Sequence, residues 1–301
     1  MRLLTQKVPR DFNIFLISCT HFGSRLHASS GFNSFIEKVE SSYEGLPHTR
    51  NYVVHHGDHI EGILADDKRF QLSSNKTAEA LPQFWEAVKA YKPIKNKIVA
   101  LMEGNHDQRL WRYGNITAAI SRELYGDFDR YASYTTRISW YDKKDRLLFK
   151  HFATHGRKSL GSAADDPIRV QSNLRLQLKR RLKMKAGDAF LMTRGHSHML
   201  FHTPPIHEMY LYEDANKITS TYTKTSQGRT WIHPDHRWYV SVGAFYRIYV
   251  SEVLKYDPMR PQESVTNSYV EMGDYDPAQL GYAVAVVRDG KIQKVNEEYI
   301  A

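Results

Sequence analysis

Residues 97–107, Lys-Ile-Val-Ala-Leu-Met-Glu-Gly-Asn-His-Asp, join a short apolar run to a polar ending. A short apolar run followed by turn-forming residues predicts a buried strand that ends at Gly104. Other apolar runs of this chain end in the same way, with Cys, His or Asp directly after the run. These endings are Ser18-Cys19-Thr20-His21, Gly57-Asp58, Thr154-His155-Gly156 and Gly195-His196-Ser197-His198. Strands that end in polar, chemically reactive side chains are therefore the main organising feature of the sequence.

The segments between these endings predict alternating strands and helices. Apolar residues recur at helical spacing in the segments 31–42, 76–91 and 167–185. We expect strands at 13–18, 51–54, 97–102, 147–153 and 188–193, and further strands at 218–224, 238–243, 246–253 and 282–287. Strand–helix alternation followed by a strand-rich part from about residue 200 predicts a layered α/β protein. No fixed repeat or low-complexity linker interrupts the chain, so we expect a single domain over 1–301.

Composition and charge restrict the class of protein. The 301 residues include 41% hydrophobic and 25% charged residues, which is typical of a globular protein. No apolar run approaches the roughly 18–20 residues that span a bilayer, and the first ten residues contain no signal-peptide core. The single cysteine, Cys19, excludes an internal disulfide. We therefore expect a soluble, cytoplasmic protein without a membrane partner, and the sequence indicates no oligomeric state.

The positive charge is concentrated in one segment. The formal net charge of the chain is +9, and the basic helical segment 157–185 carries nine basic and two acidic residues, a net +7. A local basic patch suggests a polyanionic partner. The alternative is a solvated helix face, which is the commoner reason for a run of charges.

The polar strand endings have the residue types of a metal site. Carboxyl ends of strands in an open α/β sheet meet at one crevice, so residues far apart in sequence can converge there. Thiolate, imidazole, carboxylate and amide oxygen together suit first-row transition metals better than magnesium or calcium. The candidate metal ligands are Cys19, His21, Asp58, Asn105, His155, His196 and His198.

The order of these blocks resembles the calcineurin-like metallophosphoesterase superfamily, whose pattern is D-x-H, G-D, G-N-H-(D/E), H and G-H-x-H. The resemblance covers about residues 13–198 and implies an αββα sandwich of two mixed sheets flanked by helices. It also implies two transition-metal ions (Mn, Fe or Zn) that hydrolyse a phosphoester with a bridging hydroxide as the nucleophile. One ion would be held by Cys19, His21, Asp58 and His198, and the other by Asp58, Asn105, His155 and His196.

Within this resemblance, His106 and Asp107 correspond to catalytic residues. His106 resembles the histidine that contacts the phosphoryl group and protonates the leaving oxygen, a role that suits an imidazole. We expect Asp107 to hydrogen-bond the His106 ring and to hold its orientation. Other histidines compete for these roles. His151 shares a strand with His155, and we prefer His155 because the His-Gly pair fits the family pattern.

Further histidines and one glutamate near these blocks are either structural residues or part of the metal site. We interpret His55 and His56 as structural, whereas His59 could reach the metal shell but has no fixed role in the family. Glu61 either supports a ligand or is a first-turn carboxylate of a helix.

Cys19 departs from the family pattern, which has an aspartate at this position. A thiolate supplies the same negative charge and ligates zinc or iron, so Cys19 as a ligand favours Zn or Fe at the first site. The alternative is an inert buried cysteine beside a weakened site.

Basic residues next to the proposed ligands suggest the substrate. Arg109 and Arg157 follow two of the ligand blocks, and Trp111 and Tyr113 could stack bases or pack in the core. We therefore favour a nucleic acid, DNA or RNA, or another phosphodiester as the substrate, and hence a nuclease or phosphodiesterase. A phosphomonoesterase acting on small molecules or phosphoproteins, and a non-catalytic metal-binding interaction protein, are the alternatives.

Overall fold

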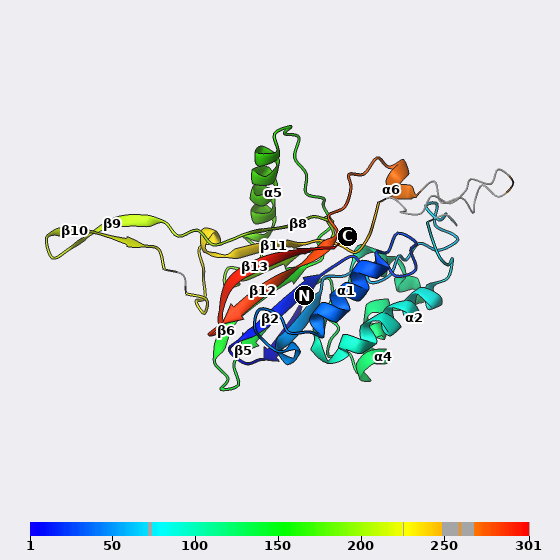
Figure 1. Cartoon of the computed structure of the whole chain (residues 1–301), viewed down its shortest axis with the longest axis horizontal. Helices are drawn as coiled ribbons and strands as arrows, with labels where there is room; N and C mark the ends of the chain where they lie inside the picture. The colour runs from blue at the N-terminus through cyan, green and yellow to red at the C-terminus, as the bar shows by residue number, and fades with distance from the viewer. Residues whose placement is uncertain (72–73, 225, 249–258, 260–267, 301) are drawn as a thin grey trace.

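A computed structural model describes residues 1–71, 74–224, 226–248, 259 and 268–300. Two mixed β-sheets form its centre (Figure 1). The five-stranded sheet has the order β13 (Lys291–Tyr299), β12 (Gly281–Arg288), β2 (Phe12–Ile17), β3 (Asn51–His55) and β4 (Ile98–Leu101). The six-stranded sheet has the order β1 (Arg2–Lys7), β5 (Thr135–Tyr141), β6 (Leu147–Thr154), β7 (Leu191–Arg194), β11 (Trp238–Val242) and β8 (Leu200–Thr203).

The direction of the strands brings the polar endings to common edges. In the five-stranded sheet, β2, β3 and β4 are parallel neighbours, so their carboxyl ends lie at the same edge. In the six-stranded sheet, β6 and β7 are likewise parallel, with Thr154 in register with Arg194. The strands that precede the five predicted ligand blocks therefore end in two groups, one from each sheet.

The two sheets pack face to face through a core of apolar side chains from both. Phe12 and Ile14 of β2 and Trp140 of β5 are fully buried in this core, and the Phe12 and Trp140 rings lie 5.3 Å apart between centroids. The alternating burial of β5 follows from the alternation of side chains across a strand with one covered face. The main core thus lies between the sheets and holds their polar ends in place.

Helices cover the outer faces of both sheets. The helices are α1 (Ser29–Val39), α2 (Ala80–Tyr91), α3 (Asn105–Arg109), α4 (Ile116–Tyr125), α5 (Pro167–Leu182) and α6 (Tyr269–Met272), with 3₁₀ turns η1 (His48–Arg50), η2 (Lys92–Lys97), η3 (Trp111–Tyr113) and η4 (Pro234–His236). Figure 1 shows α1, α2 and α4 on one side of the sheets and α5 on the other. Phe35 of α1 and Phe84 of α2 pack on the five-stranded sheet, whereas Leu178 and Leu182 of α5 pack on the six-stranded sheet.

The expected αββα class, with two mixed sheets flanked by helices, is therefore confirmed. The predicted strands that lead into the ligand blocks and the three predicted helices all form, with boundaries that shift by a few residues. The expectation of a strand at 246–253 fails for 246–248, which form no named strand, and 249–253 lie outside the described residues. None of the helices in the described part of the chain has the length and apolar character needed to cross a bilayer.

A two-stranded hairpin, β9 (Met209–Asp214) and β10 (Lys217–Tyr222), extends from the two sheets (Figure 1). It pairs only with itself among the described strands, and nearly all of its residues are exposed. Ala215 and Asn216 form its turn with positive φ angles, as tight hairpin turns require.

Candidate metal centre

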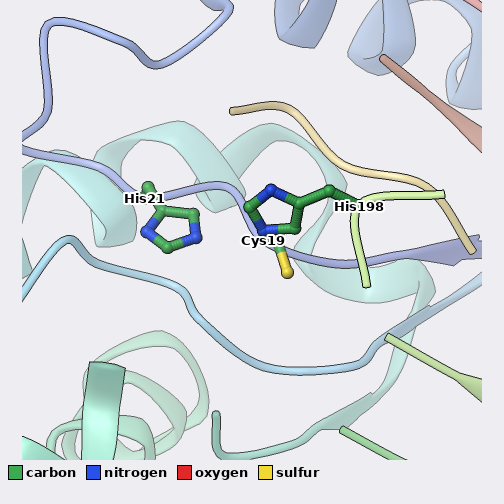
Figure 2. Close-up of side chains that lie close together, drawn as sticks. All are labelled: Cys19, His21 and His198. Atoms are coloured by element: carbon green, nitrogen blue, oxygen red, sulfur yellow. The ribbon is translucent and has the colours of Figure 1, made fainter. Parts of the chain in front are cut away.

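All seven predicted ligands lie at or directly after the carboxyl ends of strands, and they converge. Cys19 and His21 follow β2, Asp58 follows β3, and Asn105 begins α3 after β4. From the six-stranded sheet, His155 follows β6, and His196 and His198 follow β7. We call these seven residues the candidate centre. Figure 2 shows the His198 side chain reaching Cys19 and His21 from a separate segment of the chain.

Asp58 lies in the middle of the candidate centre. Its Oδ1 accepts a hydrogen bond from the His106 main-chain N–H at 2.8 Å, which fixes the carboxylate. Its Oδ2 lies 3.2 Å from His155 Nε2 and 3.8 Å from His21 Nε2. The same oxygen lies 4.0 Å from Cys19 Sγ. One carboxylate oxygen is therefore shared between ligand-type atoms from both sheets.

The potential donor atoms form two overlapping groups around this carboxylate. Donor atoms of Cys19, His21 and His198 all lie within 4.8 Å of one another, and so do those of Cys19, Asp58 and His155. On the His155 side, Nε2 of that ring lies 3.0 Å from Asn105 Oδ1, and the His196 ring is 5.1 Å from the His155 ring between centroids. Cys19 belongs to both groups, and donor atoms of His21, Glu61 and His106 form a third group within the same distance.

The backbone is strained where it presents these side chains. Left-handed φ values of 49–68° occur at five of the seven residues, namely Cys19, His21, Asp58, His196 and His198. Such values are uncommon outside glycine and cost on the order of 1–3 kcal/mol each, so they persist only where the surrounding fold enforces them. Here they turn the chain sharply at the strand ends. This clustering of strain is typical of functional sites.

The ring nitrogens of His21 and His155 are oriented for a cation. His21 Nδ1 lies 3.0 Å from the Glu61 carboxylate, and its Nε2 is buried without a hydrogen-bond partner. His155 Nδ1 donates to the main-chain oxygen of His56 at 2.6 Å, so its other nitrogen, Nε2, is the one that faces Asp58 and Asn105. A histidine that donates one N–H to a carboxylate or carbonyl presents its other nitrogen as a ligand. The chemistry of the donor set therefore fits a transition metal.

Burial and neighbouring charges act in opposite directions on the pKa of Asp58 and in the same direction on the pKa of Cys19. Burial alone would raise the pKa of Asp58, but the neighbouring His155, His106 and His21 hold it well below its usual range. Burial and the Asp58 carboxylate raise the pKa of the Cys19 thiol well above its usual value. A divalent cation beside the sulfur would reverse that shift and favour the thiolate.

Burial keeps two of the three histidines that follow β6 and β7, His196 and His198, neutral. Burial lowers the pKa of His196 to about 4 and that of His198 to about 3. Burial would also lower the pKa of His155, but the Asp58 carboxylate outweighs it and raises that pKa. Neutral imidazoles carry the free lone pair that a metal ligand needs.

His106 is beside the candidate centre, but Asp107 does not orient it as expected. The His106 ring contacts the main-chain oxygen of Glu61 through Nδ1. The Asp107 carboxylate instead accepts main-chain N–H groups of Asp58 at 2.9 Å, His59 at 3.0 Å and Gly104 at 2.8 Å. The expected Asp107–His106 ring bond is therefore wrong, because three converging N–H groups satisfy this carboxylate. Asp107 positions the loop that carries Asp58.

Gly104 shows why two ligand blocks contain glycine at a fixed place. A Cβ atom at this position would lie 2.0 Å from Asp58 Oδ1 and 2.3 Å from the Asp58 main-chain nitrogen. The loop before α3 and the loop after β3 therefore touch at Gly104, and any side chain there would displace the Asp58 carboxylate.

An open cleft of about 760 Å³ leads to the candidate centre. Its lining includes His106, Asp58 and three arginines, Arg69, Arg109 and Arg157. Both predicted substrate-binding residues, Arg109 and Arg157, therefore face the cleft. Arg69, which sequence reasoning missed, is positioned by a hydrogen-bonded ion pair with Asp67.

Two further residues support the centre. The sequence left open whether Glu61 supports a ligand, and the structure places its carboxylate 3.0 Å from Nδ1 of His21, a candidate ligand. Tyr246 stacks on the His21 ring at 4.2 Å between centroids, and its hydroxyl donates to Glu61 at 3.4 Å. Tyr246 lies within the glycine-containing segment 241–247, for which the sequence predicts no role.

Other sequence interpretations are resolved by contacts. His55 and His56 are structural, as expected: the His55 ring contacts Tyr91 OH at 3.0 Å, and the His56 ring contacts Thr193 Oγ1 at 2.6 Å. Trp111 and Tyr113 are exposed and do not pack in the core.

No protein-family model and no curated protein sequence matches this chain.

Proposed function

We propose that this chain is a metal-dependent phosphoester hydrolase of the calcineurin-like metallophosphoesterase type. The observation that carries the proposal is the Asp58 Oδ2 atom, which lies 3.2 Å from His155 Nε2, 3.8 Å from His21 Nε2 and 4.0 Å from Cys19 Sγ. A single oxygen shared by two groups of potential ligands is the arrangement that two neighbouring metal ions require. The buried, unpartnered His21 Nε2 supports the same interpretation.

The residues would divide between two ions as the resemblance implies. Cys19, His21, Asp58 and His198 would hold one ion, and Asp58, Asn105, His155 and His196 would hold the other. When bound, such a pair of ions polarises phosphoryl oxygens and lowers the pKa of a coordinated water. The sulfur of Cys19 favours zinc or iron in the first position.

The protein's own residues would bind and orient the ester. Arg69, Arg109 and Arg157 line the cleft. A guanidinium group can donate two parallel hydrogen bonds to two oxygens of one phosphoryl group. His106 lines the same cleft, where we assign it the contact with the phosphoryl group and the leaving oxygen. Burial lowers the pKa of His106 well below its usual value. A phosphate in the cleft would add negative charge beside the ring and raise that pKa toward the range needed for proton donation.

The open cleft with three arginines favours a phosphodiester, and a nucleic acid in particular, over a small phosphomonoester. The test compares hydrolysis of bis(4-nitrophenyl) phosphate with that of 4-nitrophenyl phosphate by the purified protein supplied with manganese, iron or zinc. We expect faster hydrolysis of the diester. Preferential hydrolysis of the monoester would favour a phosphomonoesterase instead.

A matched pair of variants tests the role of His106. His106→Asn should reduce kcat by about 10²- to 10⁴-fold, the usual contribution of a general acid, with unchanged metal content. His207→Asn, at an exposed histidine near the β9–β10 hairpin, is the control and should retain full activity. Absence of hydrolysis of both esters by the metal-loaded wild type would contradict the proposal and favour a non-catalytic metal-binding protein.

A further inference from the structure

A second cavity, of about 630 Å³, lies beside the cleft where β6 and β7 meet the end of α5. Five cationic residues line it, and no described carboxylate does: Arg157, Lys158, Arg181, Lys185 and Arg194. We call it the basic cavity. Five cations around one cavity without an acidic neighbour create a site for an anion.

The basic cavity contains a buried, charged group without a charged partner. Arg194 is 2% exposed, and its guanidinium donates to Ser197 Oγ at 3.2 Å and to the main-chain oxygen of Lys158. It forms no ion pair with any described carboxylate. A buried guanidinium without a counter-ion is costly, and a bound anion would offset that cost.

Arg181 provides an independent indication of a ligand. Its Nε is buried and has no hydrogen-bond partner, although its Nη2 donates to the main-chain oxygen of Ser159 at 3.1 Å. Lys158 and Lys185, in contrast, are exposed at the edge of the cavity. A donor without a partner in the cavity wall and exposed cations at its edge suit an oxyanion that enters from solvent.

The basic cavity is connected to the candidate centre. Arg157 lines both the cleft and the basic cavity. Gly156, directly after the ligand His155, has φ +84°, and a Cβ atom there would lie 2.3 Å from Arg194 Nε. Arg194 is also bound to Ser197, between the ligands His196 and His198. The guanidinium is thus anchored to the same turns that carry the metal ligands.

We infer that the basic cavity binds a backbone phosphate of a nucleic-acid strand whose neighbouring phosphodiester lies in the metal cleft. The inference rests on the proposed function, because it names the substrate of that site. A strand repeats its negative charge at every nucleotide, so one phosphate can occupy the cleft while another lies beside Arg194. Arg157, at the junction of the two cavities, is placed to contact the strand between them.

Helix α5 extends the positive charge away from the basic cavity. Arg175 and Arg180 are exposed on this helix, which stands away from the sheets in Figure 1. Lys179 is excluded from the path because it pairs with Asp235. Asp165 and Asp166 lie at the opposite, N-terminal end, where Asp166 accepts the Arg169 N–H and caps the helix. The positive surface therefore begins at the cavity and suits an extended polyanion better than a single small phosphate.

The experiment measures binding without hydrolysis. Fluorescein-labelled single-stranded DNA of about 12 nucleotides, within the usual site size, is titrated with the His106→Asn protein at about 50 to 200 mM salt. The test variant carries Arg181→Gln and Lys185→Gln in addition to His106→Asn. The control adds Lys89→Gln and Lys92→Gln, which remove two charges from the exposed surface of α2 and η2. Metal content and circular dichroism are recorded for every protein.

We expect the test variant to bind at least about 10-fold more weakly and the control to bind like the parent protein. The slope of log K against log salt should become shallower by about 0.7, the contribution of one lost phosphate contact for a single strand. Equal affinities and slopes in all three proteins would overturn the inference, as would an equal loss in the control. A phosphopeptide of equal charge that competes as strongly as the DNA would overturn the nucleic-acid assignment. DNA binding is measured separately from hydrolysis. If the protein hydrolyses neither ester, the binding experiment therefore still tests whether the basic cavity binds DNA.

Discussion

Two groups of buried or half-buried histidines lie close together in this molecule, and they differ in what their ring nitrogens contact. The core histidines are His27, His55, His56, His59 and His151, and the centre histidines are His21, His155, His196 and His198. His59 is typical of the first group: Nδ1 lies 3.0 Å from Tyr91 OH and Nε2 lies 2.8 Å from the Met102 main-chain oxygen. His155 is typical of the second: one nitrogen contacts a main-chain oxygen and the other faces Asp58.

The comparison shows that burial and residue type do not distinguish a structural histidine from a ligand. His151 makes the point most clearly, because its Nδ1 is buried without a partner, as His21 Nε2 is. The other nitrogen of His151 contacts Thr193 Oγ1 at 2.7 Å, and among the described residues no carboxylate forms a hydrogen bond or ion pair with the ring. A free nitrogen indicates a metal ligand only where a shared carboxylate and further donors lie around it.

Removing that shared carboxylate should have the largest effect. Asp58→Asn is expected to weaken metal binding and phosphodiester hydrolysis by more than about 100-fold, since even the loss of an outer partner of a ligand costs about 10- to 100-fold. Metal content and kcat/KM are measured together. Asp66→Asn, which removes a surface carboxylate paired with Arg112, should change neither. A full metal complement in Asp58→Asn would place the metals elsewhere.

His151 in β6 and His155 directly after β6 allow the comparison to be tested directly. His155→Phe should lose metal and activity, whereas His151→Phe should keep both and lower the free energy of unfolding by about 1–3 kcal/mol, the cost of a broken buried hydrogen bond. Chemical denaturation and metal analysis on both variants separate the two outcomes. Loss of metal from the His151 variant alone would mean that the wrong histidine of this strand was assigned.

The sequence predicts the strands that lead to the centre much better than the edges of the sheets. The runs before Cys19, Asp58 and Asn105 are short and apolar because these strands are buried on both faces, and that signal is strong. The pairing of β1 with β5, which joins Arg2 to Thr136, depends on contacts between distant segments. No local pattern reports such a pairing.

The candidate centre was predicted residue by residue, but its supporting contacts were not. Ligand types after strands are visible in the sequence, because chemistry restricts them to a few residues. The Asp107 carboxylate instead depends on main-chain N–H groups that only the folded loops bring together, as at His59. The stacking of Tyr246 on His21 likewise joins segments far apart in the chain.

The carboxylate behind His21 should have a smaller effect than a ligand. Glu61→Gln keeps the size of the side chain and removes the negative charge that orients the His21 ring, so metal affinity should fall by about 10- to 100-fold. Competition with a chelator measures the change. Glu123→Gln, on the exposed surface of α4, is the control. An unchanged affinity in Glu61→Gln would show that His21 is not a ligand oriented in this way.

The core histidines should make the free energy of unfolding fall modestly as the pH is lowered. Burial lowers the pKa of His27 to about 3, while its Nδ1 contacts the Thr20 main-chain oxygen at 2.6 Å. The unfolded state therefore takes up a proton near its usual pKa of about 6.5, and the stability contributed by neutral His27 is lost as the pH falls from there toward 3.

Below that unfolded pKa, His27→Gln should flatten the pH dependence of the free energy of unfolding by about 1 kcal/mol per pH unit. Urea denaturation between about pH 6 and pH 4 measures this slope. His48→Gln, at an exposed histidine, should leave it unchanged. An identical slope in the wild type and in His27→Gln would mean that His27 is protonated in the folded protein.

The most direct test of the account is the number of metal ions per chain. The purified protein is supplied with manganese, iron or zinc, freed of unbound metal and measured by inductively coupled plasma mass spectrometry against its amino-acid content. The account predicts about two transition-metal ions per chain, shared through Asp58. A protein that retains no transition metal under these conditions would contradict it.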